Sequence, residues 1–289
     1  MSSPSSCSAS ARAPVQWHCS TLAFGDFLID CNFMRRAGPA HRLLAASYLR
    51  PVAEAIDYQG PLSYFDMPAQ DVPPSAFNAR KAGLSAITAS LWRLRVGLLH
   101  ATVAADTIHV PHSDIRWRLA CAPRRIEALR LPHENIYLAY CVRLGLAPQD
   151  LVVPMPVRPR EVLVFPDSRQ PAKQIPESTL RALTDINAAT GVRTRVVRVR
   201  PPETGRIDAP GELSLWGLPA LVRAVREAEV IVSADSLPGH LAEYFERPVF
   251  ILTPQANEPL MPLSVLLCQR WGRFDAIGAY QQWITAYHG

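Results

Sequence analysis

The stretch EVIVSADSLPGHLAEYFERPVFILT, residues 229–253, contains a strand, a helix and a second strand in close succession. The apolar runs 229–233 and 248–253 are short, as buried strands are, and the helical pattern of 238–246 starts with Pro238, which suits a first turn. Strands that are apolar on both faces and joined by helices form parallel sheets covered on both sides. The stretch therefore predicts an α/β fold.

Polar residues gather where the first of these strands ends. Asp235, Ser236, Gly239 and His240 fall within six positions. A hydroxyl, an imidazole and a glycine that admits a ligand to the backbone suit an anion at the start of a helix, and the carboxylate suits a sugar hydroxyl. The alternative is an ordinary helix cap beside a histidine that is satisfied inside the fold.

The same alternation of strands and helices extends over the rest of the C-terminal half. Strands are expected at 161–166 and 194–200, and helices at 176–190 and 215–228. This pattern predicts a Rossmann-like domain over residues 160–276.

The N-terminal half predicts a second Rossmann-like domain over residues 15–150. Its expected strands are 15–24, 41–47 and 106–111, and its expected helices are 27–37, 84–100 and 134–145. Four prolines in 147–160 mark a linker, because proline continues neither a helix nor a central strand. Residues 1–14 are expected to be a flexible leader, and 277–289 a closing helix that packs back on the N-terminal domain. Two such domains facing across a cleft would place a ligand at the carboxyl ends of their strands.

Asp26 stands directly after the first expected strand, at the start of a helix. A carboxylate at that place could act as a general base towards a hydroxyl nucleophile. Aspartate is also a preferred helix cap, so the sequence leaves a capping role open.

A second polar loop, FPDSRQPAKQIPE, follows the strand at 161–166 and carries Ser168, Arg169 and Lys173. A hydroxyl, a guanidinium and an ammonium ahead of a helix that starts near Pro176 can hold a diphosphate. A solvated polar loop is the alternative.

Composition narrows the classes of function. The chain of 289 residues is 48% hydrophobic and 19% charged, with a net charge of +5, which is typical of a soluble protein that prefers an anionic partner such as a nucleotide. It lacks the basic runs and zinc-finger spacing of nucleic-acid binders, the dinucleotide glycine fingerprint, the P-loop and a D-x-D metal motif. Six scattered cysteines and the lack of an apolar leader predict a cytoplasmic protein.

Taken in order, these stretches resemble the heptosyltransferases of glycosyltransferase family 9, bacterial enzymes that extend the inner core of lipopolysaccharide. The family pattern has Gly-Asp after the first strand, a lysine before a proline-led helix, and D-[ST]-G-x-x-H-L-A before the last strands. This sequence offers Gly25 and Asp26, Lys173 with Pro176, and DSLPGHLA at 235–242. The match runs over about 161–255, and it is faint in the N-terminal half beyond Gly25 and Asp26.

The resemblance implies a GT-B fold and an inverting transfer, without a metal, of heptose or a related sugar. The donor would be a nucleotide-diphosphate sugar, with ADP favoured, and the acceptor a glycan or a glycolipid of the lipopolysaccharide type. Asp26 would be the general base, Lys173 would neutralise the diphosphate, and Asp235 would hold sugar hydroxyls. The resemblance places the other donor-binding residues at Ser168, Arg169, Glu203, Trp216, Ser236, Gly239 and His240.

Two departures from the family pattern leave the donor open. Leu237 stands where the family has glycine, and LTPQANEP at 252–259 replaces the usual FGPT. Two other functions share the fold: an epimerase or hydrolase that acts on the nucleotide sugar alone, and a non-catalytic binding or scaffold protein. The helix around 90–100 is expected to pack on the N-terminal sheet, and the alternative is peripheral contact with a membrane through Arg93 and Arg95.

Overall fold

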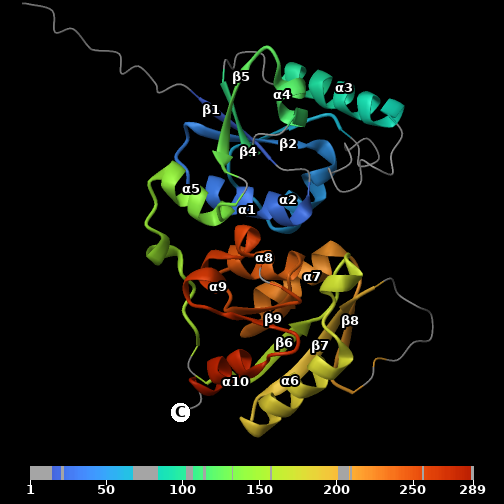
Figure 1. Cartoon of the computed structure of the whole chain (residues 1–289), viewed down its shortest axis with the longest axis vertical. Coiled ribbons are helices and arrows are strands. Elements are labelled where there is room, and N and C mark those ends of the chain that lie inside the picture. Colours follow the sequence, from blue (N-terminus) through green and yellow to red (C-terminus); the bar gives the residue numbers. More distant parts are fainter. Residues whose placement is uncertain are drawn as a thin grey trace, which may run out of the picture.

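The computed structural model describes residues 15–20, 23–67, 84–101, 107–112, 115–131, 133–156, 158–200, 208, 210–255 and 257–287. They form two α/β domains that lie one above the other, with the N-terminal domain uppermost in Figure 1. The two-domain α/β architecture expected from the sequence is confirmed. Leader residues 1–14 and Glu203 lie outside the described residues.

The described part of the N-terminal domain is built on a five-stranded parallel sheet with the order β3-β2-β1-β4-β5. Its strands are β1 (Gln16–Cys19), β2 (His41–Ala46), β3 (Leu62–Phe65), β4 (Thr107–His112) and β5 (Arg125–Arg130). Its helices are α1 (Phe24–Met34), α2 (Arg50–Ala55) after the short η1 (Ser47–Leu49), α3 (Leu84–Ala101), α4 (Ile115–Cys121) and α5 (Ile136–Leu144). Helices α1, α2 and α5 face the C-terminal domain, and α3 and α4 lie on the opposite side of the sheet (Figure 1).

The described part of the C-terminal domain is built on a six-stranded parallel sheet with the order β11-β10-β9-β6-β7-β8. Its strands are β6 (Glu161–Phe165), β7 (Arg193–Val199), β8 (Glu212–Leu215), β9 (Val230–Ala234), β10 (Val249–Thr253) and β11 (Trp271–Arg273). Its helices are α6 (Glu177–Ala189), α7 (Gly217–Glu227), α8 (Leu237–Tyr244), α9 (Leu263–Leu267) and α10 (Gly278–Thr285), with the short turns η4 (Pro171–Lys173) and η5 (Glu258–Leu260).

Both strand orders reverse direction beside the first strand of the domain. The reversal lies between β1 and β4 in one sheet and between β6 and β9 in the other. In doubly wound sheets, ligands bind outside the carboxyl ends of the strands at this point. The segments after β1, β6 and β9 carry Asp26, Lys173 and Asp235, so the topology brings these three residues to the ends of the sheets where a ligand is expected.

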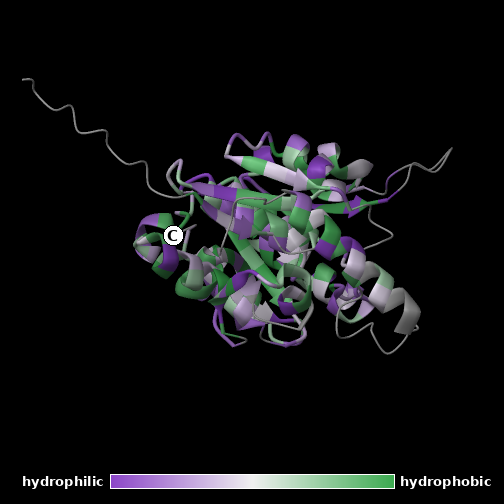
Figure 2. Cartoon of the chain, turned by 90° about the horizontal axis from the view of Figure 1, so that it is seen from above, coloured by the Kyte–Doolittle hydropathy of each residue, from purple (hydrophilic) through white to green (hydrophobic). Residues whose placement is uncertain are grey.

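The two domains share extensive apolar packing. Apolar residues gather in the middle of the molecule and polar ones around its edge (Figure 2). Strands β9 and β10 are buried along their whole length, as is α8 from Pro238 to Tyr244. Helix α8 is buried because it packs on its own sheet and also against α1 of the other domain. At the edge of this contact, Arg35 donates to the carbonyl of Tyr244 at 2.8 Å and Arg36 pairs with Glu246 at 2.9 Å.

The closing helix α10 corrects one expectation. It packs on the C-terminal sheet and not on the N-terminal domain, as its place at the lower edge of Figure 1 shows. Tyr280 and Trp283 contact Phe250 of β10, and the Tyr280 hydroxyl donates to Asn187 of α6 at 2.6 Å. The amphipathic pattern of the helix predicted an apolar partner, and that partner is the nearer sheet.

The proline-rich segment at 147–160 connects the two domains, and α3 packs on the N-terminal domain. The described residues between η3 (Pro148–Leu151) and β6 have no regular structure, and Val153 among them is anchored on the C-terminal domain by the hydroxyl of Ser264 at 2.8 Å. Helix α3 packs on its own domain, since Leu94 and Leu98 are buried while Trp92 is 64% exposed. In the part of the chain that the structure describes, no helix is long and apolar enough to cross a membrane.

Candidate active site

Asp26 lies in the first turn of α1, the helix that follows β1. The strand is shorter than the expected 15–24, since it ends at Cys19, and the helix begins at Phe24 and not at residue 27. The N-cap of this helix is Ala23, which makes no side-chain capping bond, so Asp26 is not the cap that the sequence left open. Asp26 is partly buried, and within the described residues no group forms a hydrogen bond or an ion pair with its carboxylate. Asp26 is therefore a carboxylate that the fold leaves available.

The surroundings of Asp26 shift its protonation. Burial raises its pKa from 3.8 to about 6, and the charge of Arg130 on β5 acts in the opposite direction. Asp235 of the C-terminal domain raises the pKa further, whereas Lys173 lowers it. Charges from both domains therefore act on Asp26. Its neighbour Gly25 lies against the imidazole of His240 on α8, so this end of α1 stands at the contact between the domains.

Those two loops meet in an ion pair. The Nζ of Lys173, at the end of η4, lies 2.6 Å from Oδ2 of Asp235, directly after β9. The side-chain amide of Asn257 donates to the same oxygen at 2.8 Å. Asp235 is thus held from two sides, and its side chain is only 9% exposed.

The remaining groups of the β6 loop are less constrained. The Oγ of Ser168 accepts a hydrogen bond from the backbone of Gln170 at 3.3 Å, which stabilises the turn itself. Arg169 is exposed, and its charge lowers the pKa of Asp26. Arg169 therefore lies near enough to the site to act on an anion there.

Ser236 is the N-cap residue of α8, but neither it nor Asp235 caps the helix through a side chain. The hydroxyl of Ser236 donates instead to the carbonyls of Asp167 and Ala234. The alternative of an ordinary capping motif is therefore wrong for this stretch. The polar side chains at this helix start are directed to the neighbouring loop and to Lys173.

His240 and Gly239 lie deeper in the interface. The Nδ1 of His240 lies 2.9 Å from the hydroxyl of Tyr137 on α5 of the other domain. The opposite edge of the ring faces Gly25, where an added Cβ would lie 3.1 Å from the imidazole Cδ2. A Cβ on Gly239 would meet Ile251 Cδ1 at 2.7 Å, so packing of α8 on β10 already explains this glycine.

Trp216, one of the predicted donor-binding residues, is not joined to this cluster by any described contact. Trp216 is 66% exposed at the start of α7, after β8, which lies two strands away from β6. Leu237, the departure from the family pattern, packs partly buried against the core.

Three residues of the site were missed by sequence reasoning. Arg130 ends β5, a strand whose alternating charged and apolar residues gave only a weak signal. Asn257 lies in the loop after β10, where the position after a strand could have drawn attention to it. Tyr137 lies in the first turn of α5, and nothing in the sequence marks its side chain as part of a site.

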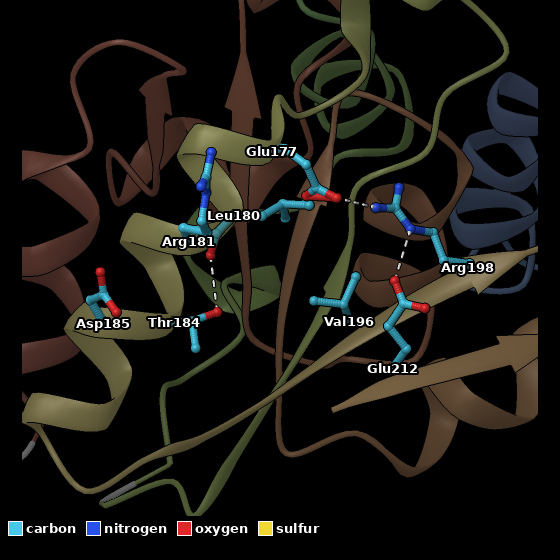
Figure 3. A pocket seen from close by; sticks show the side chains of 8 residues that line it. All are labelled: Glu177, Leu180, Arg181, Thr184, Asp185, Val196, Arg198 and Glu212. Atoms are coloured by element: carbon cyan, nitrogen blue, oxygen red, sulfur yellow. Dashed lines mark hydrogen bonds and ion pairs between the residues drawn. The ribbon is translucent and has the colours of Figure 1, made fainter. Parts of the chain in front are cut away.

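A depression on the outer side of the C-terminal domain is separate from this cluster. It lies between α6 and the strands β7 and β8, as Figure 3 shows, and none of the predicted site residues lines it. On its β7 side, Arg198 pairs with Glu177 at 3.1 Å and with Glu212 at 3.8 Å, and also with Asp167 at 2.8 Å. The charge of Arg198 is thus already neutralised by carboxylates. Across the described ranges, no group of three or more His, Cys, Asp or Glu side chains is arranged to hold a metal ion.

Two doubly wound domains that meet at the carboxyl ends of their strands define the GT-B architecture of glycosyltransferases. Neither a protein-family model nor a curated protein matches the sequence. Among solved structures, heptosyltransferase WaaC of E. coli with ADP matches with a TM-score of 0.58 at 14% identity, over 94% of this chain and 99% of that one. At these identities the similarity shows the fold.

Two further structures support the same assignment. ADP-heptose lipopolysaccharide heptosyltransferase II of E. coli matches with a TM-score of 0.53 at 13% identity, over 95% of this chain and 98% of that one. The family 9 glycosyltransferase of Veillonella parvula matches with a TM-score of 0.53 at 14% identity, over 86% of this chain and 84% of that one. The chain has the fold of the glycosyltransferase family 9 heptosyltransferases along nearly its whole length, which confirms the resemblance at the level of the fold.

Proposed function

We propose that this protein is an inverting glycosyltransferase that moves heptose or a related sugar from a nucleotide-diphosphate donor to a glycan or glycolipid hydroxyl. The observation that carries the proposal is the position of Asp26. It is an unpaired carboxylate with a pKa raised to about 6, contributed by one domain and acted on by the Lys173–Asp235 pair of the other. The similarity to heptosyltransferases solved with ADP supports a nucleotide donor.

In the proposed reaction, Asp26 accepts the proton of the acceptor hydroxyl as that oxygen attacks the anomeric carbon of the donor sugar. The bond between this carbon and the diphosphate oxygen breaks on the opposite face, so the configuration inverts. A base with a pKa of about 6 is mostly ionised at pH 7 and is still basic enough to take a proton, as general-base catalysis requires.

The leaving group is a nucleoside diphosphate, whose negative charge increases as the bond breaks. Lys173 and Arg169 are the cations placed to stabilise it, and the start of α8 adds the partial positive charge of a helix N-terminus. Lys173 is paired with Asp235, so a bound diphosphate would share the ammonium with that carboxylate. Both described bonds of Asp235 are to Oδ2, which leaves Oδ1 to accept hydrogen bonds from sugar hydroxyls. We propose that the catalysis needs no metal.

The proposed binding roles follow from these positions. The C-terminal domain would bind the nucleotide sugar, with the nucleobase near Trp216 and the ribose near Glu203, and the N-terminal domain would bind the acceptor. For a lipid-linked acceptor, the exposed Trp92 on α3 is one point at which the N-terminal domain could rest on a membrane surface.

The first test is a thermal-shift panel of ADP-, UDP-, GDP- and dTDP-sugars, because a ligand that binds the native state raises its melting temperature. We expect the largest shift with an ADP-sugar. Release of the nucleoside diphosphate is then measured with and without glycan acceptors. Release that needs no acceptor would favour the hydrolase or epimerase, and no shift with any nucleotide sugar would contradict the transferase.

A further inference from the structure

The imidazole of His240 is the one group of the C-terminal site that is held by a side chain of the N-terminal domain, among the contacts described. Its Nδ1 lies 2.9 Å from the hydroxyl of Tyr137 on α5, and both side chains are buried. The rings lie nearly parallel, at an interplanar angle of 16°. The direction of this hydrogen bond decides whether the other imidazole nitrogen, Nε2, carries a proton.

The surroundings of Tyr137 settle the direction of this bond. A phenol hydroxyl has one proton to donate, and a buried donor without an acceptor costs free energy. Within the described residues, His240 Nδ1 is the sole hydrogen-bond partner of the Tyr137 hydroxyl. If Nδ1 carried a proton, the hydroxyl would accept that bond and its own proton would have no acceptor. The hydroxyl therefore donates, and Nδ1 accepts.

The protonation state of His240 completes the argument. Burial lowers its pKa to about 4, so the ring is neutral at pH 7. A neutral imidazole carries one proton, and if Nδ1 accepts from Tyr137, that proton is on Nε2. Nε2 lies on the edge of the ring that faces Gly25, next to Asp26, and it has no partner among the described groups.

We propose that Tyr137 is a positioning residue that fixes His240 as the Nε2–H tautomer, so that the histidine presents a hydrogen-bond donor to a diphosphate oxygen of the sugar donor. The opposite tautomer would turn a lone pair towards that oxygen and would repel it. The inference rests on the proposed function for the identity of the ligand, but the tautomer itself does not depend on it.

The Nε2–H group of His240 also depends on the contact between the two domains. Tyr137 belongs to the N-terminal domain and His240 to the C-terminal domain, so separation of α5 from α8 would remove the constraint on the tautomer. A second contact between the domains holds the start of α5 in place. The side-chain amide of Asn135, the N-cap of α5, donates to the carbonyls of Glu258 and Met261, the latter at 2.9 Å. The two domains thus assemble this part of the site jointly.

The chain contains a matched control for Tyr137. Tyr140 lies one turn further along α5, is equally buried, and donates to Asp30 of its own domain at 2.6 Å. Tyr137→Phe and Tyr140→Phe each remove one buried hydroxyl from the same helix. A general loss of stability would affect both variants, whereas a change in the tautomer of His240 is expected only for Tyr137→Phe.

The experiment is a two-bond proton–nitrogen correlation spectrum of the full chain with 15N-labelled histidine at pH 7.5, with the His240 signals assigned from the spectrum of His240→Gln. We expect the Nε2–H pattern in the wild type and in Tyr140→Phe, and a mixture of tautomers in Tyr137→Phe. An Nδ1–H pattern in the wild type would overturn the proposal without any variant, and an unchanged Nε2–H pattern in folded Tyr137→Phe would also overturn it.

A binding measurement separates this inference from the proposed function. ADP is titrated into the wild type and both variants by calorimetry, and we expect roughly 3- to 10-fold weaker binding for Tyr137→Phe alone, the effect of one hydrogen bond. Equal affinity in Tyr137→Phe and the wild type would contradict the link to the diphosphate. If the wild type binds neither ADP nor any nucleotide sugar, the proposed function fails, while the spectrum still decides the tautomer.

Discussion

Lys173 and Asp235 lie 62 positions apart in the sequence, yet the Nζ of one is 2.6 Å from the Oδ2 of the other. The pair joins the loops after β6 and β9, which emerge side by side because these two strands are neighbours in the sheet. With the side chains 25% and 9% exposed, the pair is partly shielded from water, so its attraction is stronger than that of a surface ion pair. The pair holds a cation at the place that the proposed function gives to the diphosphate of the donor.

The first prediction concerns this cation. Lys173→Ala should weaken binding of the nucleotide-sugar donor by roughly 10- to 100-fold, the range for a lost charge-assisted hydrogen bond. Calorimetric titration measures the dissociation constant. Arg181→Ala is the control, because it removes one positive charge from the outer depression of the same domain. Equal losses in both variants would mean that only the overall charge matters.

The second prediction separates chemistry from binding. Asp26→Asn should leave donor affinity within about 3-fold of the wild type and lower kcat by about 100- to 10,000-fold, the usual contribution of a general base. Acceptor-dependent release of nucleoside diphosphate measures the rate. Asp185→Asn, in the exposed part of α6, serves as the control. A rate of Asp26→Asn near that of the wild type would exclude Asp26 as the base.

The pH dependence of the rate follows from the raised pKa of Asp26. The protonated carboxyl cannot accept a proton, so kcat/KM should fall as the pH drops below about 6, with the slope of a single group. Initial rates between pH 4.5 and 8.5 test this, with the thermal stability followed over the same range. A profile that is flat down to pH 5 would contradict the assignment.

The same pKa shift has a consequence for stability. Because the folded-state pKa of Asp26 lies above 3.8, the folded protein binds this proton more tightly than the unfolded chain does. The ionised carboxylate therefore reduces stability above about pH 6, by up to about 3 kcal/mol, and this cost is relieved as the pH falls through that value. The free energy of unfolding of Asp26→Asn should exceed that of the wild type at pH 8, with a smaller difference at pH 5. A difference that is constant with pH would contradict the shift.

The sequence predicted the architecture where its signals are local. The strands of the C-terminal sheet centre are short and apolar, and Pro238 and Gly145 mark a helix start and a helix end, so these elements were placed within a few residues. The edge strands of the described sheets, β3, β5, β8 and β11, were missed. RIEALR and ELSL carry charges and lack an apolar run, and LSYF and WGR are only 4 and 3 residues long. Side-chain pairing across domains has no local signal at all, which explains why Tyr137 was not found.

In the candidate site too, the features with a local sequence signal were predicted and those set by packing were not. Asp26, Lys173 and Asp235 were found because each follows a strand, and the topology then brings them together. Gly239 was assigned to ligand approach, although a glycine needed for packing gives the same sequence signal. Only the position of Ile251 on the next strand distinguishes the two explanations.

Asn257 yields a further prediction about how Asp235 is held. Asn257→Ala removes one of the two groups that bond the Asp235 carboxylate, so the KM for the donor should rise by about 10-fold, with a smaller change in kcat. Asn257→Asp should raise the KM for the donor further, because it places a second carboxylate 2.8 Å from that of Asp235. Steady-state kinetics measure both. A larger effect of alanine than of aspartate would show that the residue acts by packing.

The last prediction tests the packing explanation of Gly239. Alanine at this position would place its Cβ 2.7 Å from Cδ1 of Ile251, closer than two carbons can approach. Gly239→Ala should therefore lower the free energy of unfolding by about 1–3 kcal/mol, even though alanine favours a helix more than glycine does. Ile251→Val removes the Cδ1 methyl that clashes. The double variant should thus be more stable than Gly239→Ala, because the added and the deleted methyl share one space, and urea denaturation of the four proteins in the cycle measures this coupling. Additive losses in the double variant would mean that Gly239 is needed for another reason, with close approach of a ligand to the backbone as the remaining explanation.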